Sequence, residues 1–222
     1  MSSTKQIKGG LYLVVDPAIG VDALLPKVEL AIKGGVDAIQ LWNNWQRGQN
    51  KNELIQLICG LAHQSNIPVL INEEWQLLQT TDLDGFHADT PPVNLNNIRA
   101  AIGRPFIFGI TCGNDLSRIT WATRNNANYI SFCSMFPSPS AGACEIVNKE
   151  TVMAARRLTS LPIFLAGGIT LRNVEDLAGT GMDGIALISG IMKADDPQAT
   201  AKEFKEKLLT LKAINNEAII GE

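Results

Sequence analysis

The sequence has few of the residues that several kinds of site require. Among its 222 residues are two histidines and four cysteines, and no two cysteines have a Cys-x-x-Cys spacing. A zinc cluster is therefore not expected. We interpret Cys59, Cys112, Cys133 and Cys144 as mostly buried thiols, with a disulfide from Cys112 to Cys133 or Cys144 as the alternative.

The net charge is small, and long apolar runs are lacking as well. The formal net charge is -3 and no basic stretch stands out, which argues against a nucleic-acid surface. No apolar run approaches the roughly 18 residues that a membrane helix needs, and no apolar signal region precedes Leu11. We expect a cytoplasmic protein that binds neither nucleic acid nor a membrane.

Short apolar runs, in contrast, recur along the whole chain. They predict strands at residues 11–15, 38–41, 68–71, 85–87, 106–110, 129–133, 162–166 and 184–188. The segments between them predict amphipathic helices at residues 21–33, 53–64, 95–102, 115–125, 149–158, 171–178 and 197–211. Pro197 suits the first turn of the last helix after a cap at Asp196, and Thr170 is expected to cap the helix before it.

The alternation of strand and helix predicts an α/β fold. The strands are continuously apolar, which is typical of parallel strands covered on both faces. We therefore predict a TIM (β/α)8 barrel that forms a single domain over residues 1–222. A doubly wound open sheet is the alternative, but residues 16–20, after the first strand, lack the G-x-G-x-x-G spacing of that fold.

Two further patterns concern the repeat and the end of the chain. Gly-Val-Asp at 35–37, Asn-Ala-Asn at 126–128 and Gly-Met-Asp at 181–183 each precede a predicted strand, which indicates a quarter- or eighth-repeat of the barrel. Residues 212–222 are expected to be a C-terminal tail or an extra turn of helix. Alternatively, they form a homo-oligomer contact through Ile219 and Ile220.

The strongest indication of function is a pair of small-residue loops after the last two predicted strands. In a barrel of this class, the loops after strands seven and eight often hold a phosphate. Gly167 and Gly168 let the backbone approach an anion closely, and Ser189 beside Gly190 adds a hydroxyl. Close packing of strand against helix is the alternative, and we predict a phosphate site.

Other residues at predicted strand ends are less specific. Glu73 is either a carboxylate ligand for Mg²⁺ or an acidic residue at a helix start. Gln40 either orients a ring through its amide or caps a loop, and Trp42 and Trp45 either stack on a heterocycle or pack at the rim. His87 is interpreted as a core residue rather than as a catalyst.

The loop after the sixth strand, residues 134–142, is rich in proline and serine and contains no Lys or Arg. Loops of this kind often cover a ligand. The hydroxyls of Ser138 and Ser140 suit the oxygens of a phosphate.

In their order and spacing, these residues resemble the thiamine phosphate synthase family, including its thiazole tautomerase branch. The resemblance spans residues 11 to 208. It is carried by Leu11-Tyr-Leu-Val-Val, Gln40-Leu, Leu70-Ile-Asn72, Asp84-Gly-Phe-His87, Gly109-Ile-Thr111, Phe136-Pro-Ser-Pro-Ser140, Ala166-Gly-Gly-Ile-Thr170 and Asp183-Gly-Ile-Ala-Leu-Ile-Ser-Gly-Ile191. It implies an eight-stranded barrel that joins hydroxymethylpyrimidine diphosphate to a thiazole phosphate with Mg²⁺, releasing pyrophosphate.

One half of the family's site is implied to be intact. The pyrimidine-orienting Gln falls on Gln40, and the Asn before the metal carboxylate falls on Asn72. Thr111 stands at the family's Ser after strand five. The thiazole-phosphate site falls on three residues, Gly168, Ile188 and Ser189.

The half that binds the diphosphate departs from the family. Trp42 and Asn44 stand where the family has two cations, and Ala141 stands where its third cation, a Lys, is expected. Gly113 occupies the position at which the tautomerase branch has a working His. The catalytic residues of this chain are therefore unknown.

The implied metal site is also altered. Glu73 replaces the family's first Asp, and the second Asp falls on Pro92, for which Asp89 is the nearest substitute. We predict that the chain binds a phosphorylated heterocycle and that its standard synthase activity is weak or absent. The alternatives are a non-catalytic or regulatory barrel that binds a small phosphate, and an isomerase or lyase that acts on a sugar phosphate.

Overall fold

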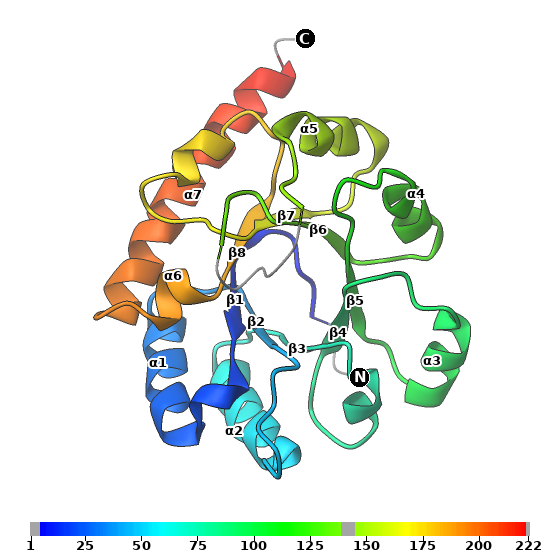
Figure 1. Ribbon diagram of the computed structural model, residues 1–222, viewed down its shortest axis with the longest axis vertical. Coiled ribbons are helices and arrows are strands. Elements are labelled where there is room, and N and C mark those ends of the chain that lie inside the picture. Colours follow the sequence, from blue (N-terminus) through cyan, green and yellow to red (C-terminus); the bar gives the residue numbers. More distant parts are fainter. Residues whose placement is uncertain (1–4, 139–144, 221–222) are drawn as a thin grey trace.

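Eight parallel strands form a closed barrel at the centre of the molecule (Figure 1). The computed structural model describes residues 5–138 and 145–220, with side chains up to residue 213. The strands are β1 (Gly10–Val15), β2 (Ala38–Leu41), β3 (Val69–Asn72), β4 (Gly85–Ala88), β5 (Ile107–Thr111), β6 (Tyr129–Cys133), β7 (Ile163–Ala166) and β8 (Gly184–Leu187). Each strand pairs with its neighbour in the sequence, and β8 pairs with β1. The prediction of a TIM barrel is confirmed, and the open sheet is excluded.

Helices surround the barrel on its outside, as Figure 1 shows. They are α1 (Val21–Lys33), α2 (Lys51–Gln64), α3 (Leu95–Ile102), α4 (Ser117–Arg124), α5 (Lys149–Leu158), α6 (Ser189–Met192) and α7 (Pro197–Ile220). The expected cap of the last helix is present, because the Asp196 carboxylate accepts the amide of Ala199 at 2.9 Å. Residues 212–220 continue α7. No helix in the described part of the chain combines the length and apolar character needed to cross a membrane.

Short 3₁₀ helices replace or add to the expected α-helices. Residues 17–19 and 75–79 form η1 (Pro17–Ile19) and η2 (Trp75–Gln79), and the helix expected at 171–178 is only η4 (Val174–Leu177). Thr170 does not cap it. Instead, the side chain of Asn173 accepts the amide of Thr170 at 2.7 Å and gives η4 no side-chain cap. The residue that would start an α-helix is used to close the preceding turn.

Aromatic side chains fill the inside of the barrel. The rings of Tyr12, Tyr129 and Phe164 lie with their centroids 5.5–5.8 Å apart, in tilted or edge-to-face pairs. Gly109 makes room for one of them, because a Cβ on this residue would lie 2.0 Å from Cζ of Tyr129. The small residue on β5 therefore fixes where the Tyr129 ring crosses the barrel.

The amino ends of the strands show a fourfold repeat. An Asp or Asn just before each even-numbered strand accepts the backbone N–H of a residue in the odd-numbered strand before it, at 2.7–2.8 Å. These residues are Asp37, Asp84, Asn128 and Asp183. The turns noted in the sequence are thus a quarter-repeat, and its fourth member, Asp84, lacks their Gly or Asn.

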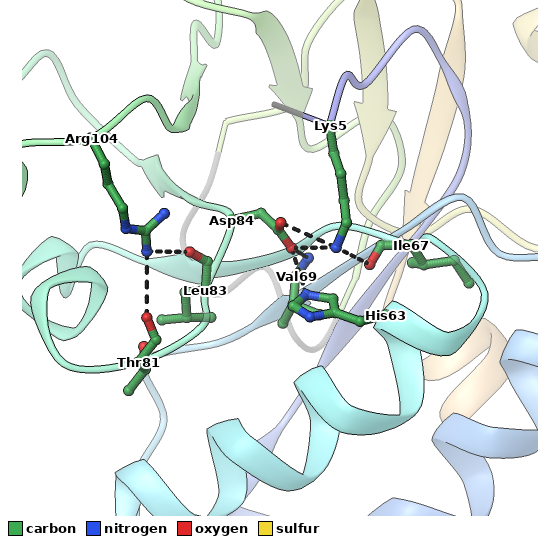
Figure 2. A network of polar contacts seen from close by, with 8 residues as sticks. All are labelled: Lys5, His63, Ile67, Val69, Thr81, Leu83, Asp84 and Arg104. Atoms are coloured by element: carbon green, nitrogen blue, oxygen red, sulfur yellow. Dashed lines mark hydrogen bonds and ion pairs between the residues drawn. The ribbon is translucent and has the colours of Figure 1, made fainter. Parts of the chain in front are cut away.

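Figure 2 shows the most elaborate of these contacts, around Asp84. Its carboxylate accepts the amide of Val69, pairs with Lys5 at 3.1 Å, and lies 2.9 Å from Nε2 of His63. Beside it, the guanidinium of Arg104 donates to the carbonyl of Leu83 at 2.7 Å. Side chains from several elements are tied together at this end, which is opposite the ends of the strands where barrel enzymes have their sites.

Candidate functional site

The carboxyl ends of the strands surround a cavity of about 1140 Å³. Most of the residues expected at a site line it: Gln40, Trp42, Asn72, Asp89, Thr111, Ser138, Gly167, Gly168, Ile188 and Ser189. Glu73 and Trp45 are not among the described lining residues. Ser140 lies outside the described residues, as does Ala141.

Two consecutive glycines shape the wall of the cavity after β7. Gly167 has a φ of 87° and Gly168 a φ of 67°, in the left-handed region that favours glycine. A Cβ on Gly168 would lie 2.6 Å from the carbonyl oxygens of Phe136 and Pro137. The loop after β6 therefore packs directly on this backbone, and only glycine fits.

Backbone donors gather next to these glycines. No acceptor among the described residues takes a hydrogen bond from the backbone N–H of Gly168, Ile188 or Ser189. The three residues line the cavity at the ends of the adjacent strands β7 and β8. Backbone N–H groups at the wall of a cavity that have no acceptor among the described residues are suited to hold an anion.

Two buried side-chain amides face the cavity from β2 and β3. Gln40 is 7% exposed and its Oε1 accepts the Tyr12 hydroxyl, while Asn72 is 2% exposed and its Nδ2 donates to Asp89. Nε2 of Gln40 and Oδ1 of Asn72 have no hydrogen-bond partner among the residues described. A donor and an acceptor on adjacent strands suit the edge of a nitrogen heterocycle.

A chain of hydrogen bonds crosses the cavity floor between β2 and β6. The Tyr12 hydroxyl contacts Oε1 of Gln40 at 2.8 Å and the hydroxyl of Tyr129 at 2.9 Å. Tyr129 contacts Nδ1 of His87 at 3.0 Å, and Nε2 of His87 contacts the Thr111 hydroxyl at 2.8 Å. The last contact of the chain, at 3.1 Å, joins Thr111 to the hydroxyl of Ser131.

Each of the side chains in this line of hydrogen bonds is uncharged near neutral pH. Burial lowers the pKa of His87 to about 4, against a smaller opposing effect of the Asp89 carboxylate. Burial also raises the pKa of Tyr12 and of Tyr129 above the ordinary tyrosine value. His87 is thus a buried residue that is satisfied on both nitrogens, as expected of a core histidine, yet it also lines the cavity.

The chain is similar to known proteins in sequence and in fold. Residues 11–191 match the family model described as thiamine monophosphate synthase. The chain belongs to this family. The resemblance of the sequence motifs is therefore confirmed over most of the chain.

Several thiamine-phosphate synthases are similar to this chain over most of its length. It is 30% identical to the thiamine-phosphate synthase of Methylobacillus flagellatus, over 89% of this chain and 94% of that protein. It is 31% identical to the one from Nitrosococcus oceani, over 89% and 91%. Among solved structures, a thiamine phosphate pyrophosphorylase from Pyrococcus furiosus shares the fold, with a TM-score of 0.80, 22% identity, and coverage of 92% of this chain and 97% of that one.

The two residues expected on the diphosphate side of the site, Trp42 and Asn44, have different surroundings. Trp42 lines the cavity, while the side-chain amide of Asn44 donates to both carboxylate oxygens of Asp16 at 3.1 Å. Lys51, the first residue of α2, is a nearby cation, but it pairs with Glu74 at 2.6 Å and lies over the Trp45 ring. Lys51 is therefore already committed to other groups.

Two cations that sequence reasoning missed do line the cavity. Arg118, at the start of α4, donates to the carbonyls of Asp89 and Thr111 at 3.3 Å and lies 3.6 Å from the Asp115 carboxylate. Lys193, just after α6, has no ion-pair partner among the described residues. Neither follows a strand directly, so a search of strand ends alone does not find them.

The cavity lining is not strongly basic. Beside the two cations, the described lining contains the carboxylates of Asp89, Asp115 and Glu145. Hydrogen bonds from Ser117 lower the pKa of Asp115 and favour its charged form. The described part of the cavity therefore has about as much negative as positive charge.

Glu73 and Asp89, the expected Mg²⁺ ligands, lie close together but are engaged with protein groups. Glu73 accepts the backbone N–H of Asp89, and Asp89 accepts the amide of Asn72 at 3.1 Å. Burial raises the pKa of Glu73, which disfavours its charged form. No group of three or more His, Cys, Asp or Glu side chains suited to a metal occurs among the described residues. These residues fit Mg²⁺ poorly, and its binding stays a prediction from the family.

Three of the four cysteines, Cys59, Cys112 and Cys133, lie among the described residues. Cys59 and Cys112 are buried thiols, and Cys112 forms no disulfide, so the alternative pairings of Cys112 are wrong. Burial raises the pKa of each of these two thiols to about 12. Cys144 lies outside the described residues. The two buried thiols are therefore inert at neutral pH.

Proposed function

We propose that this barrel binds a phosphomonoester of a small aromatic heterocycle, with the thiazole phosphate of the thiamine pathway as the expected ligand. We further propose that it forms thiamine phosphate slowly or not at all. The single observation that carries the proposal is the group of backbone amides at Gly168, Ile188 and Ser189, which have no hydrogen-bond acceptor among the described residues and lie beside a cavity large enough for a ring. These positions match the family's thiazole-phosphate site.

The buried amides on β2 and β3 support the choice of a nitrogen heterocycle. Gln40 presents a donor and Asn72 an acceptor. By resemblance, Gln40 falls on the family's pyrimidine-orienting Gln, and Asn72 falls on its Asn before the metal carboxylate. A ring with an acceptor nitrogen next to an amino group, as in an aminopyrimidine, would satisfy both. These two amides therefore favour a hydroxymethylpyrimidine as a second ligand beside the thiazole phosphate.

The charge balance supports the loss of the diphosphate reaction. Typical charge-assisted contacts contribute on the order of 1.5–3 kcal/mol each. Two of the family's cations are replaced by Trp42 and Asn44, and a third position is Ala141. Arg118 already faces the Asp115 carboxylate. Several missing contacts of this size correspond to a rate loss of roughly 10³ or more.

The test has two arms that use the full-length protein. In the first, hydroxymethylpyrimidine diphosphate and thiazole phosphate are supplied with and without Mg²⁺, and formation of thiamine phosphate is followed beside an active synthase. We expect a rate at least 10³-fold below that of the active enzyme. In the second, calorimetric titration with thiazole phosphate is expected to show binding. A normal synthase rate would contradict the loss of activity, and no binding at millimolar ligand would contradict the ligand assignment.

The alternative functions have less support. A solved 3-hexulose-6-phosphate synthase has a TM-score of 0.64 to this chain, but its 16% identity speaks for the fold alone. A purely regulatory binder gives the same calorimetric result with no turnover at all. Titration with sugar phosphates in parallel tests the remaining alternative, an isomerase or lyase that acts on a sugar phosphate.

A further inference from the structure

The hydrogen-bond chain on the cavity floor has a property that its separate contacts do not have. Five contacts join six side chains from five strands in a single line. In order along the line they are Gln40, Tyr12, Tyr129, His87, Thr111 and Ser131. All of them line the cavity, and all except Thr111 are buried.

The protons of this hydrogen-bond chain can be counted. Two tyrosines, one threonine and one serine each carry one hydroxyl proton, and a neutral imidazole carries one N–H proton. Five protons are therefore available for five contacts. Because Oε1 of Gln40 can only accept, Tyr12 must donate to it, and Tyr129 must then donate to Tyr12.

The same count fixes the state of His87. Since the Tyr129 proton is used towards Tyr12, Nδ1 of His87 must carry the N–H that donates to Tyr129. Nε2 is then an acceptor for Thr111, which in turn accepts from Ser131. If the Gln40 amide were rotated by 180°, every donor and acceptor along the line would be exchanged, and the N–H would move to Nε2.

We propose that this chain acts as one directional unit, in which the orientation of the Gln40 amide, the tautomer of His87 and the hydroxyl direction of Ser131 change only together. Tyr12, Tyr129 and His87 are then positioning residues that determine which ligands the cavity accepts. The nature of that ligand rests on the proposed function, whereas the coupling itself does not.

The coupling has a consequence for specificity. In the direction found here, Gln40 offers the cavity a donor, and Ser131 offers only lone pairs. In the reversed direction, Gln40 offers an acceptor and Ser131 a donor. A heterocycle that contacts both ends must therefore be complementary to both at once, and a ring that matches only one end leaves a buried group unpaired.

Rigid packing supports a single unit over a set of independent rotors. The Tyr129 ring is held across Gly109 and between the rings of Tyr12 and Phe164. It is also stacked on the imidazole of His87, with centroids 5.6 Å apart. Hydroxyl protons can reorient in such a chain, but the heavy atoms cannot move to find other partners.

Nitrogen-15 NMR of the protein labelled at histidine tests the hydrogen-bond chain directly, without any ligand. The sequence has two histidines, and His63 lies at the opposite end of the barrel against Asp84, so it serves as an internal control for folding. In the wild-type protein at neutral pH we expect the proton of His87 on Nδ1.

Three variants then distinguish directional coupling from a local effect. In Tyr12→Phe the Tyr129 proton has only His87 left as a partner, so the N–H of His87 is expected to move to Nε2. Gln40→Met removes the acceptor at the end of the chain and is expected to give the same switch. Ser131→Ala removes a hydroxyl nearer to His87, yet Thr111 still donates to Nε2, so no switch is expected.

The outcomes are decisive in either direction. A wild-type proton on Nε2 would overturn the direction assigned to the hydrogen-bond chain. With the wild-type proton on Nδ1, a switch in Ser131→Ala, or no switch in a folded Tyr12→Phe or Gln40→Met protein, would overturn the coupling. If the switches occur as expected but thiazole phosphate and hydroxymethylpyrimidine leave the His87 signals unchanged at millimolar concentration, the proposed ligand fails and the coupling stands.

Discussion

His87 is a buried histidine whose ordinary pKa lies near neutral pH. Burial lowers its pKa to about 4 in the folded protein, from about 6.5 in an exposed chain. Below pH 6.5 the unfolded chain takes up a proton that the folded protein refuses until about pH 4. The contribution of His87 to stability is therefore fully present above pH 6.5 and is lost as the pH falls through this window.

We predict that His87→Gln removes this part of the pH dependence. Between pH 7 and pH 5 the free energy of unfolding of the wild-type protein should fall by ~2 kcal/mol more than that of the variant, at 1.36 kcal/mol per pKa unit. Urea unfolding at both pH values measures it. Equal pH dependence of the two proteins would contradict a buried neutral imidazole.

Gly168 is the second residue at which a small change has a large expected effect. Gly168→Ala adds a Cβ against two carbonyl oxygens at a φ of 67°, so the loop and the amides beside it must move. We predict a loss of thiazole-phosphate affinity of tenfold or more, measured by calorimetry.

Gly60→Ala is the matched control for this variant. Gly60 lies in α2, outside the described cavity lining, and a Cβ there would meet no atom within 4 Å. We expect its affinity to stay within a factor of about three of wild type, since ΔΔG at tolerated sites is small. Equal losses in both variants would argue against a specific role of the Gly168 backbone.

At the scale of elements, the even-numbered strands are tied to the odd-numbered ones before them by one side chain each. Asn128 performs this role between β5 and β6 with an amide, and Asp183 performs it between β7 and β8 with a carboxylate that also pairs with Arg156 at 2.8 Å. The backbone contact is common to all four positions, whereas the ion pair is not. The contact to the strand should therefore matter more than the charge.

Substitutions at Asp183 test this order of importance. Asp183→Ala leaves the amide of Ile163 without its acceptor, and we predict a loss of about 1–3 kcal/mol in the free energy of unfolding. Asp183→Asn keeps an acceptor, as Asn128 does, and should cost less than about 1 kcal/mol. Exposed Asp176→Ala is the control. A larger loss in the Asn variant than in the Ala variant would reverse the interpretation.

At the scale of the whole molecule, the two ends of the barrel have separate roles. The four side chains that join odd-numbered to even-numbered strands lie at the amino ends of the strands, while the cavity lies at the carboxyl ends. These strand-end contacts hold the closed sheet without using the cavity residues. Ligand binding should accordingly add to stability rather than rearrange the fold.

This separation predicts how the protein responds to heat. Thiazole phosphate should raise the melting temperature in proportion to the logarithm of its concentration, with a gain of about 2.7 kcal/mol at a hundred times its dissociation constant. Differential scanning calorimetry measures the shift, and inorganic phosphate at the same concentration should give a smaller one. An unchanged melting temperature at millimolar thiazole phosphate would count against the proposed ligand.

The sequence by itself determined the barrel and the small-residue loops after its last two strands. Apolar runs at regular spacing predict buried parallel strands, and paired small residues after strands seven and eight are a local pattern that is visible without coordinates. The boundaries were less certain where side chains compete for the backbone. The helix expected at 171–178 shrinks to η4 because Asn173 closes the turn before it.

Only the tertiary structure decided which polar groups act together. Tyr12 and Tyr129 are 117 residues apart, yet their hydroxyls meet inside the barrel. Trp42 lines the cavity while Trp45 does not, and Arg118 reaches the cavity from a helix. The physical reason is that local patterns fix which face of a strand is buried, whereas the direction of a hydrogen bond depends on partners that other strands bring within about 3 Å.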